Sequence, residues 1–585
     1  MCVAQREEAG EMTTSVMADT GTPKRRRRVP SIPQWLRSSL FRQTTARPLG
    51  WRQVLGAIAF LVVGAAVSLA RTSGPGALNT IWIEDAGNFL NDALHQSVMT
   101  TLTTQMNGYY DVVQRGATAI AVLFPLSWSP GIMSAFAALD YAMFGLIAYI
   151  ASGPHLHSRW LRFLVAAPAC VIPLAYTQVN NDLATTQFVA LYGTFWLLLW
   201  RPATLAGRIV APIVMLGVTL SSILPVLFAP LVLARLIADR SKQAIALAVF
   251  WAAGLGAQWS VQLRGMSNRN TGTTSALWAL GNYATRVLPR ALFGERALGG
   301  PGTDGQGHAI PLQIPNMAMH NALIWGSWAV LVAVIIIALV RLTAPNWPLA
   351  VTALLFSVVL FVGSIVDNNP VVQPRYVIAP ALLVYLAIVA MLRPRSVLPA
   401  VSLPETVSLP ATVGVPATVG APATVAVPAT VAVPATVGAP AITQPSGTSP
   451  DDTAPEDPVA EGGPAADDVS PPAAPHKPRF QWRRPRLRWR RPRLRWRRPR
   501  LRWHKPRVRW RVALRWIPVT TFALLLAVVC GFNYRVVNNR SASPPWTSVV
   551  AAATQDCQIT GVTDYLYSFA WWNVDIPCSR VTTSP

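Results

Sequence analysis

The sequence predicts an all-α integral membrane protein of about eleven transmembrane helices, with its N-terminus in the cytoplasm and its C-terminus outside. Of 585 residues, 52% are apolar and only 13% are charged, which excludes an ordinary soluble globular protein. Uncharged runs such as Val54 to Ala70 and Leu323 to Val340 approach the length that crosses a bilayer. Lys and Arg gather in alternate loops, as cytoplasmic loops require.

The apolar runs take their directions from these basic loops. Residues 1–50 are a basic, disordered cytoplasmic terminus without a signal peptide, because Lys24 to Arg28 lie well before the first apolar run. Arg47 and Arg52 precede the first span, so the polar loop 71–115 falls outside. The predicted spans of the core, residues 51–393, are about 53–70, 131–152, 163–177, 184–200, two within 209–236, 243–262, 320–340, 347–366 and 377–392.

The segment 209–236 has two readings. Basic residues at both ends, with Ser221, Ser222 and Pro225 between them, indicate a hairpin of two short helices. A single kinked helix is the alternative, and it would invert every loop that follows.

A long insertion separates the core from the last span at 517–533. Residues 394–475 contain Pro-rich hexapeptide repeats and an acidic linker, which predict an extended or disordered spacer. Residues 476–516 repeat Arg and Trp every seven residues, and 19 of the 50 Lys and Arg lie between Lys477 and Arg515. Next to a span, this segment predicts contact with anionic lipids of the inner leaflet. Nucleic-acid binding is a rival that we do not expect, and a purely topological signal remains an alternative.

Residues 534–585 form a predicted extracytoplasmic tail. Cys557 and Cys578 both lie in it, whereas Cys170 and Cys530 lie in apolar runs. A disulfide persists in an oxidising compartment, so the predicted pair Cys557 and Cys578 agrees with the topology.

The first outside loop carries the residues best suited to chemistry. Glu84 and Asp85 stand shortly after the first span, and helical spacing places Asp85, Asp92 and His95 on one face. A carboxylate near the membrane surface can act as general base toward a hydroxyl group. A solvated loop helix is the alternative. We assign no metal site; the cofactor is unknown, with a divalent ion between Asp85 and Asp92 or His95 left open.

Several short motifs resemble the GT-C superfamily of polytopic membrane glycosyltransferases. They are the acidic pair Glu84-Asp85, Gly108-Tyr109-Tyr110 with Arg115 downstream, and Arg375-Tyr376 entering a late span. The resemblance covers residues 50–393 as architecture and departs from the family in the shortness of the tail and in the repeats.

The resemblance implies transfer of a sugar from a polyprenyl-phosphate donor to a glycan or lipid acceptor of the cell envelope, at the outer face of the plasma membrane. It places the catalytic carboxylate at Asp85, with Glu84 as the adjacent alternative. Arg115 and Arg375 are candidates to stabilise the departing phosphate. The remaining candidates for substrate binding are Tyr109, Asp111 and Asp182, the last of which also suits a helix cap.

Two other functions fit the same topology. A transporter or flippase of lipid-linked envelope intermediates would use Asp140, which lies in the middle of the second span, where ionisable residues are costly. A non-catalytic membrane scaffold would use the basic repeat to recruit a cytoplasmic partner. Deletion of residues 476–515 would abolish the function of a scaffold and leave a glycosyltransferase largely intact.

Overall fold

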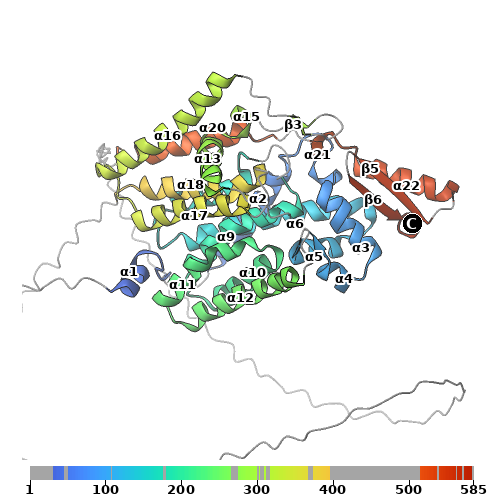
Figure 1. The fold of residues 1–585 in the computed structure, drawn as a ribbon, viewed down its shortest axis with the longest axis horizontal. Coiled ribbons are helices and arrows are strands. Elements are labelled where there is room, and N and C mark those ends of the chain that lie inside the picture. Colours follow the sequence, from blue (N-terminus) through green and yellow to red (C-terminus); the bar gives the residue numbers. More distant parts are fainter. Residues whose placement is uncertain are drawn as a thin grey trace, which may run out of the picture. The chain divides into compact units, whose positions relative to one another are not determined.

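The computed structural model describes the chain in segments: residues 31–44, 50–106, 108–174, 180–264, 275–298, 302–303, 309–310, 316–366, 373–395, 514–535, 539–560, 563–569 and 572–582. The described part is mostly helical (Figure 1). The predictions for residues 1–30, for the hexapeptide spacer and for the Arg/Trp repeat lie outside the described residues.

Six described helices are long and apolar enough to cross a membrane, as the predicted class requires. They are Trp51–Leu69 (α2), Leu126–Ala151 (η3 Leu126–Trp128 and α6 Ser129–Ala151), Lys242–Leu263 (α12), Met317–Leu339 (α16), Trp347–Val366 (α17) and Pro374–Met391 (η7 Pro374–Val377 and α18 Ile378–Met391). Shorter apolar helices cover four more predicted spans: Leu183–Leu199 (η4 Leu183–Thr185 and α9 Thr186–Leu199), Leu205–Ser221 (α10), Leu224–Ala238 (η5 Leu224–Phe228 and α11 Ala229–Ala238) and Ile517–Phe532 (α20). The total of eleven stays a prediction.

Two predicted spans are instructive in detail. The segment 209–236 forms two helices, α10 and η5–α11, separated at Ser222, so two helices are found here, as expected, in place of a single kinked helix, and their crossing of the membrane as two spans stays a prediction. The segment 163–177 differs from a continuous span: α7 (Arg159–Ala166) is followed by α8 (Pro168–Val171), because Pro168 lacks the amide that would continue the helix.

The core is centred on α9 and α18, in which every residue is buried. Aromatic side chains such as Trp196 and Phe195 pack there edge to face. The peripheral helices show the opposite pattern, since α16 and α17 leave apolar side chains such as Ile336 and Val351 exposed. Large exposed apolar side chains on uncharged helices suit a lipid environment.

A second apolar cluster joins the loop 71–115 to the C-terminal tail. The tail contains α21 (Asn539–Ala542), α22 (Trp546–Thr560), the antiparallel strands β5 (Asp564–Phe569) and β6 (Trp572–Pro577), and α23 (Ser579–Thr582). Cys557 and Cys578 form a disulfide, as expected. The hairpin packs on α3 (Asn91–His95), as Figure 1 shows in red and blue. Trp546 is buried and donates its indole N–H to the Leu126 carbonyl at 2.9 Å.

The remaining elements are short. They are α1 (Ile32–Ser39), η1 (Ala77–Asn79), the π-helix η2 (Asp85–Leu90), α4 (Val98–Thr103), β1 (Gln105–Met106), β2 (Tyr109–Tyr110), α5 (Val112–Ala121), α13 (Ala276–Asn282), the π-helix η6 (Tyr283–Val287), α14 (Leu288–Phe293), α15 (Glu295–Leu298), β3 (Gly302–Thr303) and β4 (Ala309–Ile310). Strand β1 pairs with β2, and β3 pairs with β4, both antiparallel.

Candidate functional site

The predicted acidic pair lies at an unusual turn of the loop 71–115. Ile83 has φ +23°, a value that a β-branched residue rarely adopts. Asp85 then begins the π-helix η2, and single π-turns are frequent at functional sites. Backbone outliers persist where the surrounding structure enforces them. The geometry of this turn sends the side chains of Glu84 and Asp85 to different partners.

Asp85 is only 2% exposed and binds the start of the buried helix η4–α9. Its two carboxylate oxygens accept hydrogen bonds from the backbone N–H groups of Leu183, at 2.9 Å, and Ala184, at 3.1 Å. Such amides have no partner within their own helix, and the helix dipole favours a negative charge at this end. Asp85 therefore caps η4–α9 from a distant part of the chain.

Asp182, which directly precedes this helix, is also buried and interacts directly with Asp85. Burial raises the pKa of both carboxyls, and the negative charge of Asp85 raises the pKa of Asp182 further. Two adjacent buried carboxyls cannot both ionise cheaply, so they share one proton. Because Asp85 is the acceptor of two backbone N–H groups, we assign the proton to Asp182 and the charge to Asp85.

Arg540, from the tail, is the cation that sequence reasoning missed. Burial lowers the pKa of this guanidinium, and the Asp85 and Asp182 carboxyls oppose that effect. The guanidinium is 3% exposed and makes six hydrogen bonds. Its acceptors are the carbonyls of Asn180, Asn181, Ala77 and Thr80 and the hydroxyls of Thr80 and Ser134. Arg540 thus fixes the tail to the loop that carries Asp182.

Glu84 is the more accessible carboxylate of the pair. It is 16% exposed at the side chain and forms an ion pair with Arg375, whose Nη1 lies 3.1 Å from its Oε1. The Arg375 guanidinium also lies 6.0 Å from the ring centre of Phe188, in the first turn of α9. Next to Phe188, Gln187 donates to the Tyr109 hydroxyl at 3.3 Å. Two predicted substrate-binding residues, Arg375 and Tyr109, therefore meet at the same helix start as Glu84.

Arg115 is held slightly apart from this group. Its Nη1 lies 2.6 Å from a carboxylate oxygen of Asp92, and its side chain is 1% exposed. The buried Asp111 precedes the same helix α5, and its backbone carbonyl accepts from the Arg115 amide at 2.8 Å. Gln114 donates to the Thr186 hydroxyl at 3.3 Å, which ties α5 to the start of α9.

The expected common face of Asp85, Asp92 and His95 is not found. Asp85 binds the start of η4, Asp92 binds Arg115, and His95 faces the C-terminal hairpin. The π-turn of η2 explains the difference, because its wider turn shifts the angular position of every residue that follows. A metal ion shared by Asp85 with Asp92 or His95 therefore has no support in this geometry.

Asp140 is half-buried on α6. No hydrogen bond or ion pair joins its carboxyl to any other residue that the structure describes. A carboxyl in a membrane helix is expensive unless it is protonated or meets water or a partner. Asp140 remains the residue of interest for a transport function.

Neither a family model nor a curated protein nor a solved structure is significantly similar to the chain. The chemical interpretation therefore depends on the residues described above.

One signal in the sequence pointed toward this site. Asn180-Asn181-Asp182 is polar at the end of an apolar run, and Asn181 adopts φ +58° while its side chain exchanges hydrogen bonds with Ser68. Arg540 gave no comparable signal, because its neighbours in the sequence resemble an ordinary polar tail.

Proposed function

We propose that the protein is a membrane glycosyltransferase that transfers a sugar from a polyprenyl-phosphate donor to an acceptor of the cell envelope. The observation that carries the proposal is the convergence on the start of η4–α9. The acids Glu84, Asp85 and Asp182 arrive there together with the cations Arg375 and Arg540. The proposal also includes the eleven-span topology, with this site on the outer face of the plasma membrane.

The two carboxylates of the acidic pair suit different roles. Both carboxylate oxygens of Asp85 accept hydrogen bonds from backbone N–H groups, so Asp85 is a positioning residue that fixes the start of η4–α9. Glu84 keeps one oxygen outside its bond to Arg375 and is partly exposed, so it is the group that can reach an acceptor hydroxyl. We therefore assign the general base to Glu84, the neighbour of the residue that the family resemblance favours.

The reaction follows from these roles. Glu84 takes the proton of the acceptor hydroxyl while the hydroxyl oxygen forms a bond to the anomeric carbon of the sugar. The bond between that carbon and the phosphate oxygen breaks, and its electron pair leaves with the polyprenyl phosphate. Arg375 stabilises the growing negative charge, because a guanidinium matches phosphate oxygens in a bidentate manner. Tyr109, Asp111 and Arg115 complete the proposed substrate site.

The test is sugar transfer from radiolabelled polyprenyl-phosphate sugars in membranes that contain equal amounts of each variant. We expect Glu84→Gln to lower transfer by roughly 100-fold or more, the range for loss of a general base. Asp140→Asn is the matched control, since it makes the same acid-to-amide change in a membrane helix, and it should retain activity. The reverse pattern, with Asp140 essential and Glu84 dispensable, would reject the glycosyltransferase.

A transporter of lipid-linked intermediates is the second candidate, and the observation in its favour is Asp140 on α6, which has no partner among the described residues. The transporter ranks below the glycosyltransferase because Asp140 does not belong to the group of acids and arginines at the start of η4–α9. A scaffold that acts through residues 476–516 is third, and its segment lies outside the described residues.

A further inference from the structure

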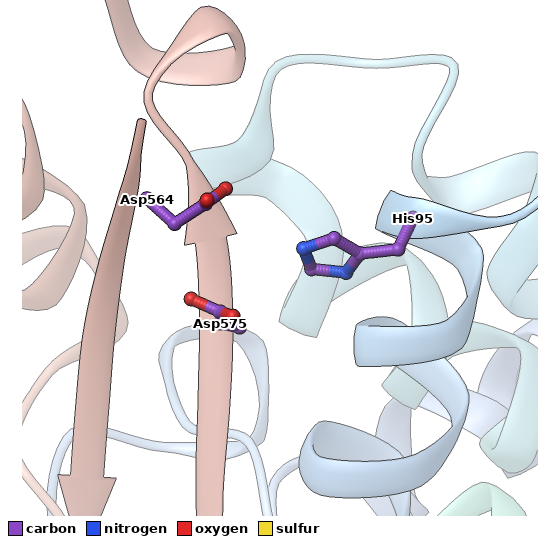
Figure 2. A group of neighbouring side chains, drawn as sticks. All are labelled: His95, Asp564 and Asp575. Atoms are coloured by element: carbon purple, nitrogen blue, oxygen red, sulfur yellow. The ribbon is translucent and has the colours of Figure 1, made fainter. Parts of the chain in front are cut away.

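Three potential metal ligands meet where the first outside loop contacts the C-terminal hairpin. His95 ends α3, Asp564 begins β5, and Asp575 lies in β6. One ligand atom from each residue lies within 4.8 Å of the other two. Figure 2 shows the imidazole of His95 on the blue helix facing the two carboxylates of the red strands.

The hairpin register places the two carboxylates together. Asp564 pairs with Pro577, and Asp575 lies two residues before Pro577, so the two Asp residues are diagonal neighbours on one face. Like charges at such positions repel each other. No Lys or Arg forms an ion pair with either carboxylate among the residues that the structure describes; Asp564 accepts only from the Thr563 hydroxyl, at 2.8 Å. Within the described part of the chain, the pair therefore presents two carboxylates without a Lys or Arg counter-ion.

The imidazole is oriented as in a metal site. Nδ1 of His95 lies 2.8 Å from the Asn91 carbonyl oxygen, so this nitrogen carries the proton and donates it. That tautomer leaves the lone pair on Nε2, the ring nitrogen that points toward the carboxylates in Figure 2. A carbonyl that holds Nδ1–H in this way is the usual outer partner of a metal-binding histidine.

The same residue also fixes the opposite side of the cluster. The side-chain oxygen of Asn91 accepts the backbone N–H of Asp575 at 2.9 Å. Asn91 thus orients the imidazole through its backbone and holds β6 beside α3 through its side chain. His95 and Asp575 are thus positioned by hydrogen bonds that leave Nε2 of His95 and the carboxylate of Asp575 free to bind an ion.

We propose that His95, Asp564 and Asp575 bind a divalent transition-metal ion, with Zn²⁺ as the best match. One imidazole nitrogen and two carboxylate oxygens are Zn²⁺ ligands, whereas Ca²⁺ and Mg²⁺ prefer oxygen alone. Ligand atoms about 2.0–2.2 Å from one tetrahedral Zn²⁺ ion lie about 3.3–3.6 Å from one another. The side chains of His95 and Asp564 are exposed, so they can move the roughly 1 Å that closes the site around an ion.

The ion would connect two segments that are remote in the sequence. Residue 95 belongs to the loop that also carries the acidic pair, and residues 564 and 575 belong to the disulfide-closed tail. Binding to the folded chain alone would stabilise this junction. The site stands apart from the proposed transfer reaction, since its ligands do not contact Glu84 or Arg375, so it can be tested without any knowledge of the substrate.

The experiment measures Zn²⁺ bound to the purified, untagged full-length protein by mass spectrometry after equilibrium dialysis. We expect one tight site in the wild type. His95→Gln, Asp564→Asn and Asp575→Asn should each weaken binding by at least about tenfold. His157→Gln, which removes an exposed histidine elsewhere, is the matched control and should bind as the wild type does.

Two further readouts separate metal binding from folding. Thiol labelling establishes that the Cys557–Cys578 disulfide is intact in each variant, and substitution with Co²⁺ gives visible absorption that reports nitrogen and oxygen ligands. The proposal is overturned if the wild type binds no more Zn²⁺ than His95→Gln, or if Asp564→Asn and Asp575→Asn with intact disulfides bind as tightly as the wild type.

Discussion

Replacement of Arg540 by Met is predicted to destabilise the junction of the tail with the outer loops. The change removes six hydrogen bonds and the cation beside the buried Asp85 and Asp182 carboxyls. Each buried acceptor left without its donor costs about 1–3 kcal/mol, but the total is less than the sum of the separate bonds, because the guanidinium no longer has to be desolvated. We therefore expect Arg540→Met to lower the free energy of unfolding by about 3–5 kcal/mol.

Arg540→Lys separates the effect of the positive charge from the effect of the hydrogen-bond geometry of the guanidinium. Lysine keeps the positive charge but has three N–H donors instead of five and no planar fork, so the expected loss is smaller, about 1–3 kcal/mol. The control is Arg535→Met, which removes an exposed arginine from the same segment and should stay within about 0.5 kcal/mol of the wild type.

The assay is reversible unfolding in mixed detergent micelles, followed by tryptophan fluorescence, with the free energy extrapolated to zero denaturant. The reasoning about the buried charges would be refuted by an Arg540→Met variant within about 1 kcal/mol of Arg535→Met. A Lys variant as unstable as the Met variant would show that hydrogen-bond geometry matters and the charge does not.

Three further predictions concern the same region. Gly74→Ala should reduce thermal stability more than Gly76→Ala: both glycines have positive φ, but a Cβ at residue 74 would overlap a backbone carbonyl of the tail, whereas residue 76 has open space. Equal effects would contradict that contact. Cys557→Ser should lower the free energy of unfolding by about 3 kcal/mol, the amount expected for a disulfide that closes a loop with 21 residues of separation. The variant's tail should also be cleaved faster by protease, and an unchanged rate of proteolysis would contradict this prediction. Because its pKa is raised in the folded protein, Asp182 contributes stability at low pH that is lost as the pH rises above about 4, its ordinary value, toward the raised value. Asp182→Asn should therefore flatten the decline of unfolding free energy with rising pH, and a variant that declines as steeply as the wild type would refute the shared proton.

The membrane class and most helix positions could be predicted because they depend on local composition. Runs such as 347–366 are uncharged over the length of a bilayer, and α17 has the same bounds. The described part of the segment 163–177 is divided into two helices at Pro168, a local effect that apolar composition alone did not predict.

The sequence predicted most residues of the candidate site, but it did not predict which of them would contact one another. Asp85 and Asp182 were both candidates, yet nothing in the sequence indicated that one carboxyl would cap the helix that follows the other. Helical spacing placed His95 beside Asp85 and failed, because the π-turn η2 changes the periodicity. Arg540 lies 359 residues from its partner Asn181, and His95 lies even farther in the chain from Asp564 and Asp575, distances over which sequence periodicity carries no information.

The most direct test of the proposed activity uses the purified protein in liposomes loaded with a radiolabelled polyprenyl-phosphate sugar and supplied with envelope acceptor. A glycosyltransferase should release one polyprenyl phosphate for each sugar transferred, and Glu84→Gln should abolish both products together. Movement of intact donor from one leaflet to the other, with no polyprenyl phosphate released and with dependence on Asp140, would contradict the proposal and identify a flippase.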